Sequence, residues 1–337
     1  MDERERARRM QIRRAKRRRN VLIMKCIISL LTLIVVFLAV ILIKDAVIPG
    51  LKNHKNSKKP EAQQTVQQNG DGTETQTEAA DSVDDMIAQA DLLAAQYDYS
   101  GAIELLKSSS LYTGSQKMQD AAAGYETTRQ SCTAYPLDQV THVFFHTMIK
   151  DDAKAFDGDS KEAGYNQVMT NMSEFRKIME SMYEKGYVMV SLHDMCIVNQ
   201  DGTVSQGEIL LPPGKIPFVL SQDDVSYYHY MDGDGFAQKL IVDENGDVKN
   251  TYVEDDGSIS VGDYDMVPWI DTFVKQHPDF SYHGHKGIIA LTGYEGVLGY
   301  RTDEVYRTRE AGRVTEYQQK FFDEHPDFDE AAWENEV

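Results

Sequence analysis

Hydrophobic residues fall into three zones along this chain, and the first is a continuous apolar run near the N-terminus. Cys26 to Ile43 contains no charged residue, and its only polar side chains belong to Ser29 and Thr32. As a helix rising about 1.5 Å per residue, the run would span roughly 27 Å, close to the roughly 30 Å of hydrocarbon in a bilayer. With the apolar residues just before it, the run predicts a transmembrane helix over residues 21–43.

The second zone follows a polar interval and has helical spacing. Residues 44–80 hold almost no large apolar side chains and predict a flexible linker. Between 81 and 131 the apolar positions Leu93, Tyr97, Ala102, Ile103 and Leu106 recur at helical spacing around a turn expected at Tyr99–Gly101. A third helix is predicted from about Ser115 to Arg129. The hairpin resembles one tetratricopeptide-type unit, which cannot stack alone into a solenoid. It is interpreted as a helical stalk; the alternative is a module that holds a protein partner.

In the third zone, residues 135–337, apolar strands alternate with amphipathic helices. The predicted strands are Val140–Phe145, Tyr187–Leu192, Ile216–Leu220 and Gly287–Leu291. One helix face consists of Phe175, Ile178, Met179 and Met182, with Asn171 or Ser173 as its cap and Gly186 at its end. A second helix face consists of Trp269, Ile270, Phe273 and Val274. This alternation favours an α/β domain with a parallel sheet or barrel.

An acidic stretch rich in glycine turns, residues 231–263, interrupts this alternation. Its turn sequences are DGDG, ENGD and EDDG, and the segments between them alternate apolar and polar residues. The pattern predicts a hairpin insertion at the surface of the domain. Neither DGDG nor DENGD fits the twelve-residue calcium loop with its closing Glu, so the aspartates are interpreted as turn residues.

Charge fixes the expected orientation of the chain in the membrane. The first 20 residues hold ten Lys/Arg against three acids, which predicts a cytoplasmic tail. No small-x-small cleavage site follows the apolar run, so it is interpreted as an uncleaved signal-anchor. The chain as a whole has 54 Asp/Glu against 35 Lys/Arg and lacks the basic footprint of a nucleic-acid-binding protein. We therefore expect a single-pass protein of the cell membrane with an extracytoplasmic C-terminal domain.

Candidate chemistry lies where the strand in KIPFVLSQDD runs into two adjacent acids, Asp223 and Asp224. In parallel α/β folds the carboxyl ends of the strands carry the chemistry, because the loops that follow them converge there. Two neighbouring carboxylates repel each other. A cation beside one of them would relieve the repulsion and leave the other to take a proton from metal-bound water. The alternative is a solvated Asp–Asp turn after a strand.

The order of segments around this pair resembles a known family. HVFFHTMIKDD, then NMSEFRKIMESMYEKGYVMVSLHDM, then LPPGKIPFVLSQDD is similar to the front half of a polysaccharide deacetylase domain, the NodB-like carbohydrate esterases. KGIIALTGYEGVLGYRT stands in the place of the family's next strand, so the resemblance covers roughly Thr141 to Thr302. It implies an α/β fold of the distorted, partial β/α-barrel type. The apolar run and the helical segment place one transmembrane helix and a short α-helical region before this domain.

By this resemblance Asp223 matches the family's catalytic base and Asp224 its metal-binding aspartate. The metal implied is divalent, usually zinc, and the implied enzyme is a hydrolase of non-peptide carbon–nitrogen bonds. Its substrate would be an N-acetylated glycan polymer such as peptidoglycan or an exopolysaccharide. The alternative is a non-catalytic wall-associated protein that binds glycan or a partner through a degenerate deacetylase fold.

The sequence departs from the family pattern in four places. Ser221 and Gln222 replace the usual Thr-Phe before the acids, Val225 replaces the usual Gly after them, and the insertion at 231–263 is large. The family's two metal-binding histidines, in a His-Ser/Thr-x-x-His motif, have no match. The chain ends at Val337 about where the segment leading to that motif would begin, so we expect a fragment with an incomplete barrel.

The remaining candidates are weaker by position. His146 ends the first predicted strand and is expected to line the site or to serve as a structural histidine. Arg301 follows the last predicted strand and is expected either to meet an acid or a sugar hydroxyl there or to be a surface arginine. His283 and His285 would share one side of a strand, but they precede it, away from the chemistry. His193 is a structural histidine or a minor candidate.

Overall fold

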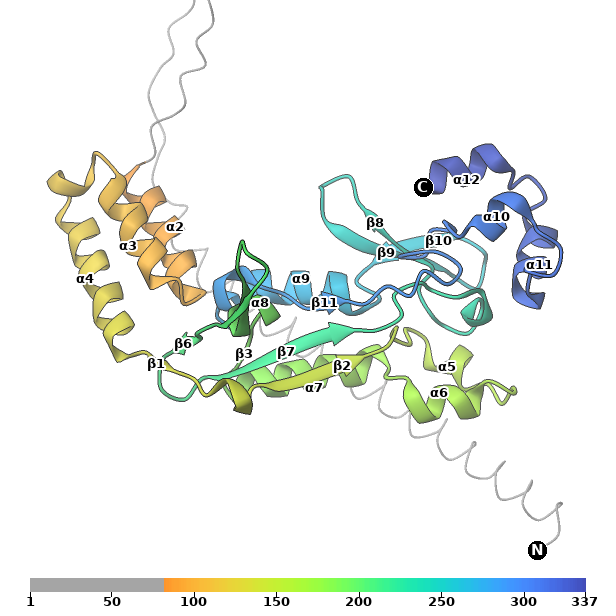
Figure 1. Ribbon diagram of the computed structural model, residues 1–337, viewed down its shortest axis with the longest axis horizontal. Helices are drawn as coiled ribbons and strands as arrows, with labels where there is room; N and C mark the ends of the chain where they lie inside the picture. The colour runs from red at the N-terminus through yellow and green to blue at the C-terminus, as the bar shows by residue number, and fades with distance from the viewer. Residues whose placement is uncertain (1–81) are drawn as a thin grey trace, which may run out of the picture. The chain divides into compact units, whose positions relative to one another are not determined.

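The computed structural model describes residues 82–337 (Figure 1). The predicted basic tail 1–20, transmembrane segment 21–43 and linker 44–80 lie outside the described residues. Within residues 82–337, none of the helices combines the length and the apolar character needed to cross a bilayer.

The chain from 82 to 131 forms three helices, α2 (Val83–Ala95), α3 (Tyr99–Ser108) and α4 (Gln116–Ser131). Their shared core consists of Met86, Ala90, Ala102, Leu106, Met118 and Ala122. The turn between α2 and α3 comes earlier than the predicted Tyr99–Gly101. The Asp98 carboxylate accepts a 2.8 Å hydrogen bond from the Gly101 amide and so starts α3 at Tyr99.

A four-stranded parallel sheet lies at the centre of the α/β region, and β7 (Ile216–Gln222) is its common strand. On one side β7 pairs with β2 (Thr141–Phe145), from Thr141 opposite Phe218 to Phe145 opposite Gln222. On the other side it pairs first with β3 (Tyr187–Met189) and then with β11 (Ile288–Ile289). The predicted α/β class with a parallel sheet is therefore confirmed. In the described part of the chain the strands do not close into a barrel.

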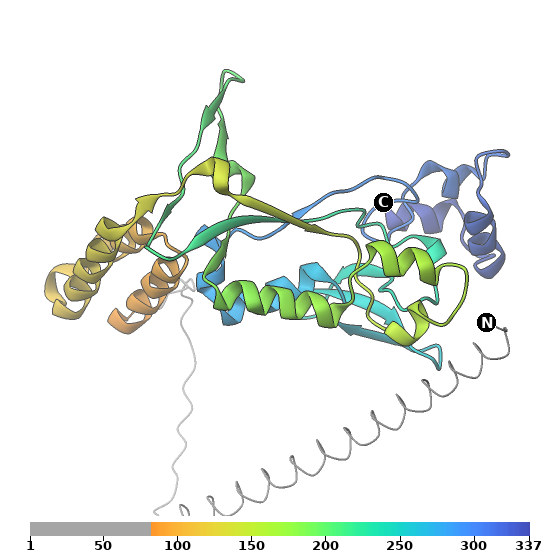
Figure 2. The same ribbon diagram turned by 90° about the horizontal axis from the view of Figure 1, so that it is seen from below.

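Two helices, α7 (Met172–Glu184) and α9 (Met266–Gln276), lie on the same side of β2 and β7 (Figure 2). The core between them includes Phe145, Phe175, Met179, Phe218, Leu220, Ile270 and Phe273. Asn171 caps α7 in a capping box with Glu174. Gly186 follows the helix with a φ of 81°. Of the four residues predicted to form the apolar face of α7, only Ile178 is exposed, at 39 %.

The acidic insertion is larger than the predicted hairpin. It forms a three-stranded antiparallel sheet of β8 (Lys239–Val242), β9 (Val248–Val253) and β10 (Ile259–Gly262). Asp-initiated turns join the strands: Asp243 accepts hydrogen bonds from the amides of Asn245 and Asp247, and Asp256 accepts one from Ser258. The middle strand β9 packs against α9, so the insertion belongs to the body of the domain.

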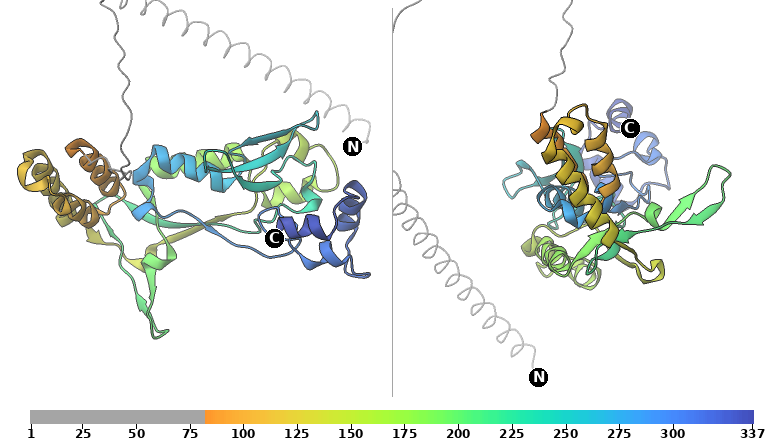
Figure 3. Two further views of the ribbon diagram at one scale, coloured as in Figure 1. Left: turned by 90° about the horizontal axis from the view of Figure 1, so that it is seen from above. Right: turned by 90° about the vertical axis from the view of Figure 1, so that its left-hand side faces the viewer.

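The shorter elements complete the described chain. They are β1 (Thr133–Ala134), α5 (Asp152–Ala155), α6 (Glu162–Val168), α8 (Leu192–Met195), β4 (Cys196–Val198), β5 (Val204–Gln206), β6 (Leu210–Leu211), α10 (Glu304–Thr308), α11 (Glu316–Glu324) and α12 (Glu330–Glu336). The green β4–β5 hairpin projects from the rest of the domain (Figure 3). The strand predicted over 187–192 is shorter than expected, because Ser191 caps α8 and the chain leaves the strand before it.

We predict that Gly186→Ala destabilises the domain. The glycine has a left-handed backbone, and an added Cβ would stand 2.7 Å from the Gly214 carbonyl oxygen. Left-handed backbone alone costs an L-residue about 1–2 kcal/mol. The free energy of unfolding, measured by urea denaturation, should fall by about 2 kcal/mol or more.

Gly124→Ala is the matched control, because Gly124 lies inside α4 and its φ is not positive. Apart from the backbone of α4 itself, nothing lies within 4 Å of the place a Cβ would take. That variant should gain up to about 1 kcal/mol from helix propensity. Equal effects at the two glycines would contradict the assignment of Gly186 as a left-handed helix end.

Candidate active site

The predicted candidates Asp224 and His146 lie together at the carboxyl ends of two neighbouring parallel strands. Phe145 and Gln222 are paired in register, so the residues that follow them emerge side by side. The Asp223 amide donates a 2.8 Å hydrogen bond to the Phe145 carbonyl and extends this pairing by one residue. The His146 Nδ1 atom then lies 3.7 Å from Asp224 Oδ2, with both side chains partly exposed.

The backbone turns sharply at Asp224. Its φ of 58° is left-handed, a conformation that aspartate tolerates better than most residues. The Asp224 carbonyl accepts hydrogen bonds from the Ser226 amide at 2.7 Å and from the Thr147 hydroxyl at 3.5 Å. The strand therefore ends here, and the Asp224 carboxylate is held near the end of β2.

A group of tyrosines lies beside Asp224. Two of them, Tyr228 and Tyr230, belong to the segment VSYYHY, for which the sequence alone predicted no role. Tyr228 and Tyr230 stack with ring centroids 5.6 Å apart, and half-exposed Tyr294 lies 5.7 Å from Tyr228. Burial raises the pKa of Tyr230 to about 12, and the neighbouring Tyr228, once it is ionised, and the Asp224 carboxylate act in the same direction. The site thus combines carboxylates with aromatic faces, which offer apolar contact area and polar hydroxyl tips.

A buried carboxylate, Asp265, lies beneath the ends of both strands. Its Oδ1 accepts hydrogen bonds from Gln222 Nε2 at 2.7 Å and from the Met148 amide at 3.1 Å. It also caps α9 by accepting from the Met266 amide, while its Oδ2 accepts from the Tyr227 hydroxyl at 2.8 Å. Four donors from four segments therefore meet at one side chain that is fully buried.

The Asp265 network extends into the insertion. Asn250 of β9 donates to the Tyr227 hydroxyl at 2.9 Å, and Asn250 is itself fully buried. Burial raises the pKa of Asp265 to about 6, although its hydrogen bonds act in the opposite direction. Sequence reasoning missed this residue; the only local signal is an acid directly before the apolar helix of MVPWIDTFV, where an N-cap is expected.

Arg301 lies behind the loop that follows the aspartate pair. It is buried, and its guanidinium donates to the carbonyls of Ser226 at 3.2 Å and Tyr227 at 2.8 Å. Its Nη1 also lies 3.9 Å from the carboxylate of Glu295, which is 1 % exposed. Arg301 thus meets an acid, and in this arrangement it supports the loop backbone rather than presenting its charge to solvent.

Among the described residues, none of the other, weaker histidine candidates joins the aspartate pair in a cluster of ligand atoms. His283 and His285 precede the strand β11, as predicted, and lie on the turn η6 (Tyr282–Gly284) and the residue after it rather than in extended backbone. The reason is the left-handed φ of 52° at His283, which breaks extended backbone. Both come close to Asp194 of α8. His193 is exposed beside that aspartate.

The aspartate pair meets the donor requirement of a zinc site only in part. Asp224 and His146 offer a carboxylate oxygen and a ring nitrogen, the atoms that zinc prefers, at a spacing two ligands of one ion can adopt. Catalytic zinc sites use three protein ligands. Among residues 82–337, no third His, Cys, Asp or Glu joins these two in a cluster of closely spaced ligand atoms.

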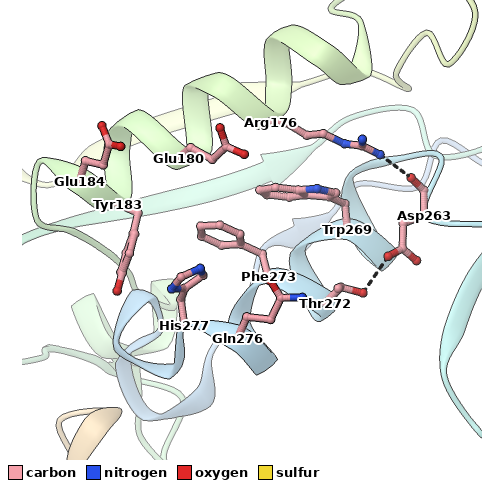
Figure 4. Close-up of a pocket in the computed structure, with 10 residues that line it drawn as sticks. All are labelled: Arg176, Glu180, Tyr183, Glu184, Asp263, Trp269, Thr272, Phe273, Gln276 and His277. Carbon is pink, nitrogen blue, oxygen red and sulfur yellow. Dashed lines mark hydrogen bonds between the residues drawn. The ribbon is translucent and has the colours of Figure 1, made fainter. Parts of the chain in front are cut away.

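A groove between α7 and α9 lies apart from these residues (Figure 4). Its volume is about 550 Å³. Trp269 and Phe273 stack along its floor with centroids 4.7 Å apart, and Asp263 accepts hydrogen bonds from Arg176 and Thr272 at one end. None of the predicted site residues lines it.

Comparison with known proteins gives no match to a family model, to a curated protein or to a solved structure. The resemblance to polysaccharide deacetylases stays a prediction from the sequence motifs.

We predict that Asp265 makes the stability of the domain depend on pH between roughly 4 and 6. Its pKa of about 6 in the folded state exceeds the ordinary value of 3.8, so the folded state binds this proton more tightly than the unfolded state. The resulting stabilisation is complete below about pH 4 and is lost as pH rises through 6, with an upper limit of about 3 kcal/mol. Urea denaturation of wild type and Asp265→Asn at several pH values measures it.

The asparagine variant cannot ionise, so its stability relative to wild type should improve as pH rises from 4 to 7. Other titrating groups are common to both proteins and cancel in the comparison. Asp265→Ala is the contrasting control: it leaves four donors without their acceptor and should cost roughly 3 kcal/mol or more at every pH. A constant difference between wild type and Asp265→Asn across this range would refute the assignment.

Proposed function

We propose that this protein is a hydrolase that removes N-acetyl groups from a glycan polymer outside the cytoplasm, tethered by the predicted helix at 21–43. The observation that supports it best is the pairing of Asp224 with His146 across the ends of β7 and β2, directly beside Asp223. An acid pair and an imidazole at the carboxyl edge of a parallel sheet provide groups that can hold a cation and move a proton.

In this proposal Asp223 is the general base. It takes a proton from water as the water oxygen attacks the acetamide carbonyl carbon. As the carbon–nitrogen bond breaks, Asp223 returns this proton to the leaving nitrogen, and the acetic acid that forms gives its proton to the sugar amine, leaving acetate and an ammonium group. Asp224 and His146 would hold a divalent cation, zinc by the family resemblance. A bound divalent cation polarises a carbonyl oxygen and lowers the pKa of water.

The tyrosines beside Asp224 support a carbohydrate substrate. Half-exposed Tyr294 and partly buried Tyr230 both pack on buried Tyr228, so one cluster offers ring faces and hydroxyl groups at the surface. Sugar rings have apolar C–H faces and polar rims, which match such amphipathic side chains. The predicted anchor fits an immobile polymer near the membrane better than a diffusing metabolite.

A second function, glycan binding without catalysis, is favoured by one observation. The described residues bring only two metal donors to the aspartate pair, where catalytic zinc uses three. The tyrosine cluster serves binding equally well in either case.

We predict that Asp223→Asn lowers acetate release from chitooligosaccharide or wall glycan at least about 100-fold, because the general base is lost. Asp224→Asn should lower it as strongly by removing a cation ligand. The matched control is Asp255→Asn, at a side chain that is 90 % exposed on the insertion and remote from the pair in sequence. Full activity in Asp223→Asn would disprove the proposed role.

Glycan binding separates the two functions. If wild type binds the oligosaccharide without releasing acetate, and Tyr230→Ala weakens that binding, the non-catalytic function holds. If Asp223→Asn binds like wild type but releases no acetate, the hydrolase holds.

A further inference from the structure

A cluster of metal-binding side chains lies at Asp194, His283 and His285, residues that the proposed function does not use. Each offers one ligand atom, and these atoms all lie within 4.8 Å of one another. Asp194 Oδ1 and His285 Nε2 are 3.4 Å apart. No other three His, Cys, Asp or Glu side chains among the described residues bring their ligand atoms this close together.

The spacing suits a tetrahedral ion. Zinc lies about 2.0–2.1 Å from imidazole nitrogen and carboxylate oxygen, so two tetrahedral ligands stand about 3.4 Å apart. The Asp194–His285 pair already has this separation. The ligand atom of His283 needs to approach the other two by at most about 1.4 Å to reach the same spacing, which side-chain rotation supplies. Two histidines and one carboxylate leave the fourth position to water or a ligand.

The carboxylate is oriented before any ion binds. Asp194 Oδ2 accepts a 2.8 Å hydrogen bond from the Ser191 amide in the capping box of α8. Its Oδ1 is thereby directed to His285. Hydrogen bonds of this kind to a metal-binding carboxylate fix its geometry and strengthen binding.

The histidine turn is held in a strained conformation. His283 has a left-handed φ of 52°, which is unfavourable for a residue with a Cβ. Its amide donates a 2.8 Å hydrogen bond to the Gln96 carbonyl at the end of α2, and its ring stacks on Tyr282 at 3.9 Å. Strain of this kind persists where surrounding contacts enforce it, and here it brings the two rings to the same carboxylate.

A simple ion pair accounts for less of this geometry. A protonated His285 beside Asp194 would explain the 3.4 Å contact, but it leaves the position of His283 unexplained. We propose that Asp194, His283 and His285 form a zinc site distinct from the aspartate pair. The His283 amide is hydrogen-bonded to the Gln96 carbonyl at the end of α2. The bound ion would therefore link α8 and the histidine turn to the helical hairpin.

Zinc binding to the full 337-residue chain tests the proposal. Affinity is measured by competition with a chelator, and bound zinc is counted by elemental analysis. His283→Ala, His285→Ala and Asp194→Asn should each weaken this site at least about 100-fold, more than the loss of an outer-shell partner. His193→Ala is the matched control, because this exposed histidine directly precedes Asp194, and it should bind zinc like wild type.

A second measurement tests whether zinc bound at this site stabilises the domain. Zinc should raise the thermal unfolding midpoint of wild type and His193→Ala, and the increase should be clearly smaller in His283→Ala and His285→Ala. The site is disproved if wild type binds no zinc, or if the two histidine variants bind it as wild type does. It is also disproved if Asp224→Asn alone removes all zinc. Loss of acetate release with this zinc site intact would instead count only against the proposed hydrolase.

Discussion

The arrangement of the candidate site depends on one buried carboxylate, that of Asp265. It joins the end of β7 through Gln222, the segment after β2 through the Met148 amide, the start of α9 and the loop residue Tyr227. Burying a charge is costly unless hydrogen bonds compensate it, and four donors offset part of that cost here. The same four bonds fix where two strands end relative to each other. The positions of His146 and Asp224 follow from that.

The loop after the aspartate pair is held from two sides. Tyr227 bonds to Asp265 through its hydroxyl, and its carbonyl accepts from Arg301. The Arg301 charge is itself balanced by buried Glu295. Side chains that must act at fixed distances need such support, since small displacements weaken catalysis or coordination. Ion pairs and hydrogen bonds below the surface thus hold the loop, so that the partly exposed Asp223 and Asp224 are not needed to support it.

The sequence predicted individual helices and strands, but not the contacts between residues that are distant in sequence. Helix α7 followed from apolar spacing, the Asn171 cap and Gly186, and β7 from its apolar run ending at the acids. The Asp265 network joins segments from 148 to 266, and no periodicity reports such contacts. The Asp194 cluster was missed for the same reason, because its members lie on separate elements and one of them needs a left-handed turn. The insertion was predicted as a hairpin and has a third strand, because alternating residues indicate strands but not how many of them pair.

The one-sided pairing of β2 has a consequence for self-association. Within residues 82–337 this strand pairs only with β7, so the N–H and C=O groups of its outer edge lack a strand partner, and Phe144 beside them is 56 % exposed. An open edge accepts another extended segment readily. The edge of β2 is therefore where copies of this chain would first adhere to one another.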